Sequence, residues 1–332
     1  MIVAAQSARQ WFRSYFASQI KPGSAEQKEI QLNHFARYLG REALLTDFSV
    51  EQIEASTSQL ITTRRWSLGT AAKYKREIRS IWSRAASTGH AAPAGKLGKV
   101  KPPKNDATAW TEHQVDIIVN ATELLDGSVD GIPLAAWTEA KLRWLHNSGA
   151  RHNETLELRR SDFDLDNGVA RIPGRMRKNG QPLAVTLTAG TVAALRKIWR
   201  PCLQDAMFPW PHQVRALDGL LRRLLILAGL RGTQTVRDLI AANRRQRGVH
   251  LERLVQQAVD KRDLWHKWRR TFATHAYARS RDIELVKRWL DHSDLKVTYG
   301  YIDWTQVGGV TQRDVIRDPG GRTQLQLFDT GT

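Results

Sequence analysis

The sequence predicts a mainly α-helical protein with one small sheet formed by a β-hairpin, an α+β fold in two domains. Its apolar residues recur at helical spacing, and several such runs open with Ser or Thr followed by Gln three residues later. Asn179-Gly180 lies between two extended runs and is typical of a tight hairpin turn. Residues 91–106 are rich in Gly, Pro and Lys without periodicity, which indicates a linker. We therefore expect domains at residues 1–104 and 105–332.

The first domain has the pattern of a helical module. Ser24 and Gln27 predict the start of a helix that ends at Gly40. Ser49 gives the same start signal for the next helix, and a further helix is expected from near Thr70. This helix has an apolar stripe of Tyr74, Ile78, Ile81 and Trp82. Basic residues are predicted on its other faces, namely Lys73, Lys75, Arg76, Arg79 and Arg84.

The second domain combines helices with the hairpin. Thr111 and Gln114 predict a helix start, strands begin near Val169, and helices resume near Ala189. Residues 231–263 are polar and expected to be partly helical, and we assign them no chemistry. Most of the 12 tryptophans lie at helical spacing with aliphatic residues, which favours a place in the core over base stacking.

The charge of the chain favours a polyanionic partner. It has 332 residues with 51 Lys and Arg against 33 Asp and Glu, a formal net charge of +18. Between Arg64 and Lys104 the only acidic residue is Glu77. A solvated helix face with a basic linker is the alternative explanation of this run. We predict phosphate contacts from Lys73, Arg76, Arg79, Lys99, Lys101 and Lys104.

Several classes of protein are disfavoured. No stretch approaches the length of a membrane span and the N-terminus lacks a signal peptide, so we expect an unexported, cytoplasmic protein. Cys202 is the only cysteine, which excludes an internal disulfide and a cysteine-based zinc site. No H-E-x-x-H spacing or acidic cluster indicates a metal site, so none is predicted.

Two segments of the second domain bring cations to expected turns. Residues 149–158 (GARHNETLEL) place Arg151 after a glycine, where its planar guanidinium could bind a phosphate. A surface ion pair with Glu154 is the alternative for this arginine. Lys178 is expected at the tip of the hairpin, where an isolated lysine is usually solvated.

Two later segments bring histidines, arginine and tyrosine. In residues 266–275 (HKWRRTFATH), His266 and Arg269 are three apart and share one helix face, whereas His275 is expected to pack. In residues 289–301 (WLDHSDLKVTYGY), Tyr301 lies nine residues after His292. Tyr299 is the only nearby competitor, and on a helix it would point away from Tyr301.

These four segments, in this order, resemble the catalytic domain of the tyrosine recombinase (phage integrase) family over about Thr111–Tyr301. The helical first domain is similar in character to the core-binding domain of that family. The resemblance implies six catalytic residues: Arg151, Lys178, His266, Arg269, His292 and Tyr301. Asp291 stands where the family usually has glycine, which puts the geometry of the turn before His292 in doubt.

The resemblance implies a site-specific recombinase or integrase that cleaves and rejoins double-stranded DNA through a 3′-phosphotyrosyl intermediate. It implies no cofactor, a tetramer on paired DNA sites, possible accessory DNA-bending factors and a place on the nucleoid. The segment after Trp304 is a candidate for packing against a neighbouring protomer or back on its own domain. The alternatives are a type IB topoisomerase-like relaxing enzyme, a non-catalytic DNA-binding regulator on an integrase scaffold, and a basic structural protein with coincidental motifs.

The resemblance also implies a role for each residue. Arg151 and Arg269 would bind the nonbridging phosphate oxygens, and His292 would donate a hydrogen bond to the phosphate. His266 would assist proton transfer from Tyr301, and Lys178 would protonate the leaving 5′ oxygen. Glu154 is a candidate support for the site.

Overall fold

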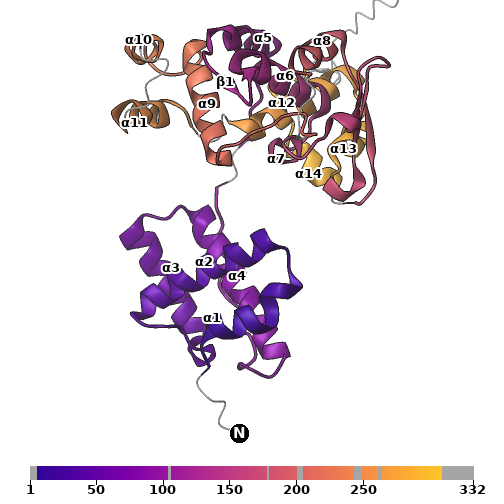
Figure 1. Cartoon of the computed structure of the whole chain (residues 1–332). Coiled ribbons are helices and arrows are strands. Elements are labelled where there is room, and N and C mark those ends of the chain that lie inside the picture. The colour runs from indigo at the N-terminus through magenta and orange to yellow at the C-terminus, as the bar shows by residue number, and fades with distance from the viewer. Residues whose placement is uncertain are drawn as a thin grey trace, which may run out of the picture. The chain divides into compact units, whose positions relative to one another are not determined.

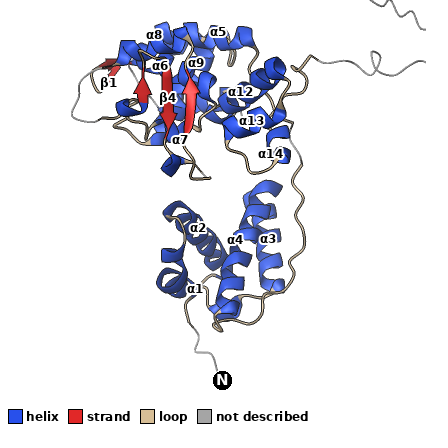
Figure 2. Ribbon diagram, turned by 90° about the vertical axis from the view of Figure 1, so that its right-hand side faces the viewer, coloured by secondary structure: helices blue, strands red, loops and turns tan. Residues whose placement is uncertain are grey.

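The structure is a computed structural model of the whole chain, and it describes residues 6–103, 106–177, 179–199, 205–242, 249–260 and 264–308. The chain divides into two compact units, Met1–Asn105 and Asp106–Thr332 (Figure 1). Helices predominate in both units and the paired strands lie in the second (Figure 2). The expected mainly helical α+β fold is therefore confirmed.

The first unit is a small helical domain around an apolar core. Its α-helices are α1 (Ala8–Trp11), α2 (Pro22–Leu39), α3 (Val50–Arg64) and α4 (Leu68–Ser87). Shorter turns are the π-helix η1 (Phe12–Phe16) and the 3₁₀ helices η2 (Ala17–Gln19) and η3 (Leu45–Asp47). Trp11, Phe35, Ile53 and Tyr74 are among the side chains buried between these elements.

The helix limits of the first unit follow local capping chemistry. Ser49 caps α3 by accepting from Gln52 N, and Gly40 ends α2 in the left-handed conformation, both as predicted. The start predicted at Ser24 is wrong, because α2 already begins at Pro22. Proline is favoured in the first helical turn, since its missing N–H has no partner there.

Helix α4 has the predicted apolar stripe, which packs into the core. It begins at Leu68 instead of Thr70, because the hydroxyl of Ser67 caps it. The prediction that Lys75 lies on an outer face is wrong. Its side chain is buried, and Nζ bonds both carboxylate oxygens of Glu54 at 2.6 Å.

The expected linker has no helix or strand over its described residues, but its first half makes contacts with the helices of the first unit. Leu97 is buried in the core of the first unit. Trp82 Nε1 donates to Ala92 O at 2.9 Å, and Gly98 N donates to Glu54 Oε1 at 2.7 Å. Residues 91–98 therefore lie against the first unit.

The second unit contains most of the secondary structure. Its α-helices are α5 (Glu112–Asn120), α6 (Leu134–Ser148), α7 (His152–Thr155), α8 (Ala189–Ile198), α9 (Val214–Leu227), α10 (Gln234–Ala242), α11 (Val249–Ala258), α12 (Trp265–Ser280), α13 (Ile283–Leu290) and α14 (Leu295–Tyr299). The 3₁₀ helices are η4 (Ala121–Leu124), η5 (Arg160–Asp162) and η6 (Gly174–Met176). The strands are β1 (Ser128–Val129), β2 (Ile132–Pro133), β3 (Phe163–Asp164), β4 (Val169–Ile172) and β5 (Leu183–Thr186).

The sequence signals of the second unit are largely confirmed. Thr111 and Gln114 form the predicted capping box of α5, and α8 begins at Ala189. Helices α10 and α11 account for the partly helical region after Arg231. Among the described tryptophans most are buried or half-buried, as predicted, although Trp199 and Trp304 are exposed.

The sheet that carries the predicted hairpin has the antiparallel order β3-β4-β5 (Figure 2). Val169 pairs with Thr186 and Ile172 with Leu183, so the hairpin is confirmed. The tight turn at Asn179-Gly180 is wrong, because residues 173–182 separate the paired strands. Pro173 and Pro182 flank this connection and cannot donate to the strand ladder, which ends the pairing early.

The long helix α6 lies in the core of the second unit, and its end directs the chain toward the functional residues. Trp137, Leu142 and Trp144 of α6 are fully buried. The helix ends at Gly149, whose φ is +62°. A Cβ added there would lie 2.3 Å from Phe272 Cδ1 of α12, so both the backbone conformation and the packing require glycine.

We expect Gly149→Ala to lower the free energy of unfolding more than Gly40→Ala does. Gly40 also ends a helix with positive φ, but a Cβ there meets no described atom within 4 Å. The left-handed conformation should cost both variants about 1–2 kcal/mol. Overpacking against Phe272 should add about 1–3 kcal/mol at Gly149 alone. Urea denaturation followed by circular dichroism measures the difference. An equal loss of unfolding free energy in the two variants would show that the Phe272 side chain moves aside without a measurable cost.

Candidate active site

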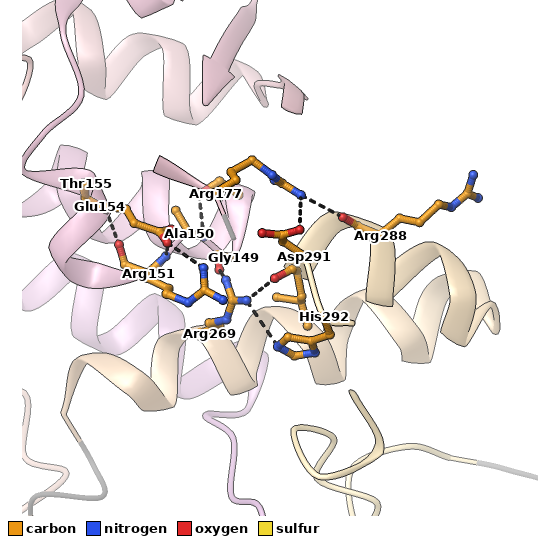
Figure 3. Close-up of polar contacts among 12 residues, drawn as sticks. Gly149, Ala150, Arg151, Glu154, Thr155, Arg177, Arg269, Arg288, Asp291 and His292 are labelled. Carbon is orange, nitrogen blue, oxygen red and sulfur yellow. Dashed lines mark hydrogen bonds and ion pairs between the residues drawn. The ribbon is translucent and has the colours of Figure 1, made fainter. Parts of the chain in front are cut away.

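Arg269 on α12 joins two turns of the second unit. Its side chain is buried, Nη1 donates to Gly149 O at 2.6 Å, and Nη2 donates to Leu290 O. Nη2 also lies 3.3 Å from His292 Nε2 (Figure 3). The end of α6 and the end of α13 are thereby held on one guanidinium.

Arg151 follows the first of these turns and is fixed by Glu154. Oε2 of Glu154 accepts from Arg151 N at 3.1 Å, and Oε1 accepts from Arg151 Nη1 at 2.6 Å. One carboxylate thus caps the short helix α7 and orients the guanidinium beside that of Arg269 (Figure 3). The Arg151 side chain remains 39% exposed, so part of its planar fork faces solvent.

His292 leaves the second turn in a fixed orientation. At the end of α13, Asp291 N bonds to Arg288 O at 3.2 Å and His292 N bonds to Lys287 O at 3.1 Å, the pattern of a Schellman motif. Asp291 takes the left-handed position with φ 57°. The glycine-to-aspartate departure noted in the sequence therefore leaves the turn intact.

The tautomer of His292 follows from its neighbours. An arginine N–H can only donate, so Nε2 of His292 accepts from Arg269 and Nδ1 carries the ring proton. Nδ1 then donates to Thr298 Oγ1 at 3.1 Å, and Thr298 is fully buried. This hydroxyl, which no sequence motif indicated, sets the plane of the imidazole.

Tyr301 lies between two histidine rings. Its ring centroid is 5.1 Å from that of His266 and 4.6 Å from that of His292. Arg269 Cζ is 5.8 Å from the same centroid. Tyr299 is exposed and stacks on Trp304 instead, with ring centroids 5.7 Å apart. The two tyrosines thus point to different places, as predicted.

The backbone around Tyr301 is anchored to the buried side of α12. Ile302 is buried, and Asp303 N donates to Thr274 Oγ1 at 3.0 Å. Asp303 Oδ2 accepts from Ala109 N at 3.0 Å. These bonds fix the chain on one side of the tyrosine, while α14 fixes it on the other.

The positive charge of the site acts on both histidines. Burial, followed by the charges of neighbouring arginines, lowers the pKa of His266 and that of His292 to about 4 each. Burial, and then the nearby Arg151, lowers the pKa of Arg269 to about 10. At neutral pH both imidazoles are uncharged and Arg269 is protonated.

An aromatic cluster supports the site from behind. The ring of His152 stacks on Trp265 with centroids 4.3 Å apart, which joins the residues next to Arg151 and His266. Lys141 of α6 is fully buried, and its Nζ lies 5.3–5.6 Å from the rings of Trp137, Phe208 and Trp265. Burial lowers the pKa of Lys141 to about 7.

The arrangement suits a tetrahedral anion. The guanidinium groups of Arg151 and Arg269 converge with the ring of His292 (Figure 3), and the ring of Tyr301 lies beside His292 and Arg269. Such groups bind phosphate oxygens and stabilise developing negative charge. The structure brings together the predicted residues Arg151, His266, Arg269, His292 and Tyr301. Lys178 lies outside the described residues. His275 is buried and lies 3.1 Å from His146, consistent with the expected packing role.

The predicted phosphate-binding residues belong to the first unit and the linker. Arg76, Arg79, Lys99 and Lys101 are exposed. Lys73 is half-buried and donates to Gln27 Oε1 at 2.5 Å. Lys104 lies outside the described residues.

The described part of the chain was also inspected for metal ligands and membrane helices. Among its residues, no cluster of three or more His, Cys, Asp or Glu side chains is placed to hold a metal ion. No described helix is both long and apolar enough to cross a membrane.

Comparison with known proteins identifies the family. Residues 109–306 match the phage integrase family, and this region is more than half of the chain. The chain therefore belongs to the phage integrase family.

Two curated relatives are tyrosine recombinases named XerC. The protein from Pseudomonas syringae pv. syringae is 27% identical over 213 residues, which are 64% of this chain and 62% of that protein. The protein from Pseudomonas aeruginosa strain PAO1 is 28% identical over 195 residues, 58% of this chain and 56% of that protein. The match therefore spans less than two thirds of either relative.

Solved structures share the fold at low sequence identity. The Tn1549 transposon integrase in complex with a circular intermediate DNA has a TM-score of 0.66 and 12% identity, covering 94% of this chain and 98% of that chain. A lambda integrase dimer bound to a COC′ core site has a TM-score of 0.62 and 15% identity, covering 96% and 79%.

We expect Lys141→Met to raise the free energy of unfolding, because it removes a buried cation that aromatic rings surround. The folded pKa of about 7 lies below the ordinary 10.5, so the unfolded chain binds more protons between these values. The penalty of Lys141 is full below pH 7 and fades toward pH 10.5. The gain in Lys141→Met should shrink over that window in urea titrations.

Lys197→Met is the matched control, because Lys197 is exposed and bonds Glu139 at 2.9 Å. It should change stability little at any pH. A gain in Lys141→Met that is independent of pH would contradict the assignment.

Proposed function

We propose that the chain is a site-specific DNA recombinase that cleaves and rejoins strands through a 3′-phosphotyrosyl intermediate. The observation that carries this proposal is the position of Tyr301 between His266 and His292, beside the buried Arg269. A phenol in this setting has a phosphate-binding group on one side and a proton acceptor on the other.

In the proposed reaction, Tyr301 Oη attacks a backbone phosphorus and the bond from phosphorus to O5′ breaks. The tyrosine becomes esterified to the 3′ phosphate, and a 5′ hydroxyl is released. The number of phosphate ester bonds is unchanged, so attack by a 5′ hydroxyl rejoins a strand without ATP. The ordinary pKa of a phenol is about 10, so the attack needs a proton acceptor. His266, uncharged at neutral pH, is placed for that role.

Arg151 and Arg269 are proposed to bind the nonbridging oxygens as phosphorus becomes five-coordinate. Donors fixed before the reaction contribute several kcal/mol each to such a step, because they need no rearrangement. Arg269 is fixed by carbonyl oxygens and Arg151 by Glu154. A bound phosphate also raises the pKa of His292, which favours a proton on Nε2 and a bond from it to the phosphate.

Lys178 is proposed as the general acid that protonates the departing O5′. It directly follows Arg177, a described residue of the connection between β4 and β5. An alkoxide is strongly basic, so its expulsion near neutral pH requires a proton donor.

Double-stranded DNA is the proposed substrate, with the first unit as the core-binding domain within residues 1–104. The charge of +18 and the exposed cations of α4 and the linker support this assignment. Solved structures with the same fold are complexes of a transposon integrase and of a lambda integrase dimer with DNA. Exchange of four strands requires two duplexes, so we propose a tetramer on paired sites. The tail proposed to join protomers lies outside the described residues from residue 309 onward.

Two other activities share parts of this chemistry. A type IB topoisomerase-like enzyme would relax DNA alone, whereas a recombinase pairs sites, and the curated relatives are named recombinases. A non-catalytic regulator would need no nucleophile, and the position of the Tyr301 ring next to His266 and His292 favours an enzyme over such a regulator.

We expect the wild-type chain to form a covalent adduct when it is mixed with a library of nicked duplexes of random sequence. The adduct should form with those members of the library that contain its site. Nicking traps the intermediate, because the released strand diffuses away. Tyr301→Phe should abolish the adduct, since it removes the attacking oxygen. Tyr299→Phe is the matched control and should retain it, because Tyr299 stacks on Trp304. Denaturing gels detect the adduct, and sequencing of the captured DNA identifies the site. A wild-type chain without adduct contradicts the proposed function.

We expect DNA binding to weaken steeply with salt, because each bound phosphate releases counterions. Replacing Arg76, Arg79 and Lys101 with Ala should reduce the slope of log affinity against log salt by about 0.9 for each phosphate that is no longer bound. Fluorescence anisotropy with the captured duplex measures the slope. Lys21→Ala, at an exposed lysine outside the proposed set, is the control. An unchanged slope in the triple variant would contradict the predicted phosphate binding.

A further inference from the structure

The connection between β4 and β5 is folded tightly upon itself. Arg177 N donates to Gly174 O at 2.9 Å, and Gly180 N donates to Arg177 O at 3.3 Å. A Cβ added at Gly174 would lie 2.1 Å from Gly180 O, so the two sides of the connection touch. Asn179 Oδ1 accepts from Gln181 N at 2.9 Å. A contact at Arg177 therefore constrains the described residues on both sides of this connection, Gly174 and Gly180.

Arg177 makes such a contact with the turn before His292. Its Nη2 lies 3.6 Å from Asp291 Oδ1 and donates to Arg288 O at 3.3 Å (Figure 3). Both side chains of the ion pair are only 7% exposed, so water and salt screen it little. Removing one partner would leave the other charge buried, which is costly.

The presence of aspartate at position 291 supports a role for the Arg177–Asp291 ion pair. Its backbone is in the left-handed conformation, where glycine is the least strained residue and Asp is tolerated at some cost. An aspartate here adds a carboxylate that meets Arg177. The same turn is held from its other side by Arg269, through Leu290 O and His292. The pair thus ties the hairpin to the part of the turn that also orients the site.

We propose that the Arg177–Asp291 ion pair is a positioning device that anchors the connection between β4 and β5 at the turn before His292, and that it acts on the reaction through Lys178, the next residue in the chain. This inference rests on the proposed function, in which Lys178 protonates O5′. In this scheme Arg177 and Asp291 contact neither the DNA phosphate nor Tyr301. They act on the reaction only through Lys178. Burial lowers the pKa of Arg177, and the charge of Asp291 opposes this shift.

The test compares cleavage of two nicked substrates by the full chain, using the duplex captured in the adduct experiment. One carries oxygen and the other sulfur at the bridging 5′ position of the scissile phosphate. A thiolate leaves without protonation, so the sulfur substrate reports every function except that of the general acid. Arg177→Met and Asp291→Asn are the variants, because Asn keeps the shape and tolerates the left-handed conformation.

We expect each variant to cleave the oxygen substrate about 10- to 100-fold more slowly than the wild type, as a misplaced catalytic group would. Cleavage of the sulfur substrate should stay within about threefold. The double variant should be no slower than either single variant, because the two residues act as one unit. In a Lys178→Ala background, Asp291→Asn should cause no further loss on the oxygen substrate. Asp166→Asn, which breaks the exposed pair with Arg196, should leave both rates unchanged.

Equal slowing of both substrates would overturn the proposal, because the pair would then shape His292 or the fold and not the general acid. Unchanged cleavage of both would overturn it as well. A further loss in the Lys178→Ala background would show that the pair acts on another group. If the wild-type chain forms no adduct on any duplex, the proposed function itself is wrong. This outcome differs from the three above, in which the wild-type chain cleaves DNA and only the role of the ion pair is contradicted.

Discussion

The site depends on one buried guanidinium. The hydrogen-bond partners of Arg269 include two carbonyl oxygens and the ring of His292, none of which carries a negative charge. Carbonyl oxygens satisfy the donors without cancelling the charge, so a positive field remains in a region of low dielectric. Burial lowers the pKa of His266 and that of His292, and this field lowers both further. In the proposed reaction, a DNA phosphate supplies the negative charge that this field favours, and the donors are fixed before the reaction begins.

The rest of the site follows from how two helices end beside Arg269. Helix α6 ends at Gly149 and α13 ends at Asp291, and each end residue takes the left-handed conformation. Such an ending turns the chain sharply and directs the next side chains, Arg151 and His292, toward the same place. Arg269 donates hydrogen bonds to one carbonyl oxygen at each of these ends, that of Gly149 and that of Leu290. The geometry of the site is therefore built from helix termini, which rigid helices place accurately.

The sequence could predict what is local and could not predict what distant residues contribute. The capping box at Thr111, the N-cap at Ser49, the end of α2 at Gly40 and the existence of the hairpin depend on neighbours in sequence, and the structure confirms them. The Arg177–Asp291 pair joins residues more than a hundred positions apart, so no spacing indicates it. Lys75 and Lys141 illustrate the same limit. A lysine in an amphipathic helix is normally solvated, and only the packed neighbours reveal that these two are buried.

The two histidines of the site have different surroundings, although both have a lowered pKa. His292 is fixed by two partners, Arg269 and Thr298, so its orientation is set before any ligand arrives. His266 is an exposed residue, and its ring meets that of Tyr301 edge to face. A fixed imidazole suits a binding role and an accessible one suits proton transfer. The two roles proposed for these residues thus follow from their surroundings, independently of the order of the motifs in the chain.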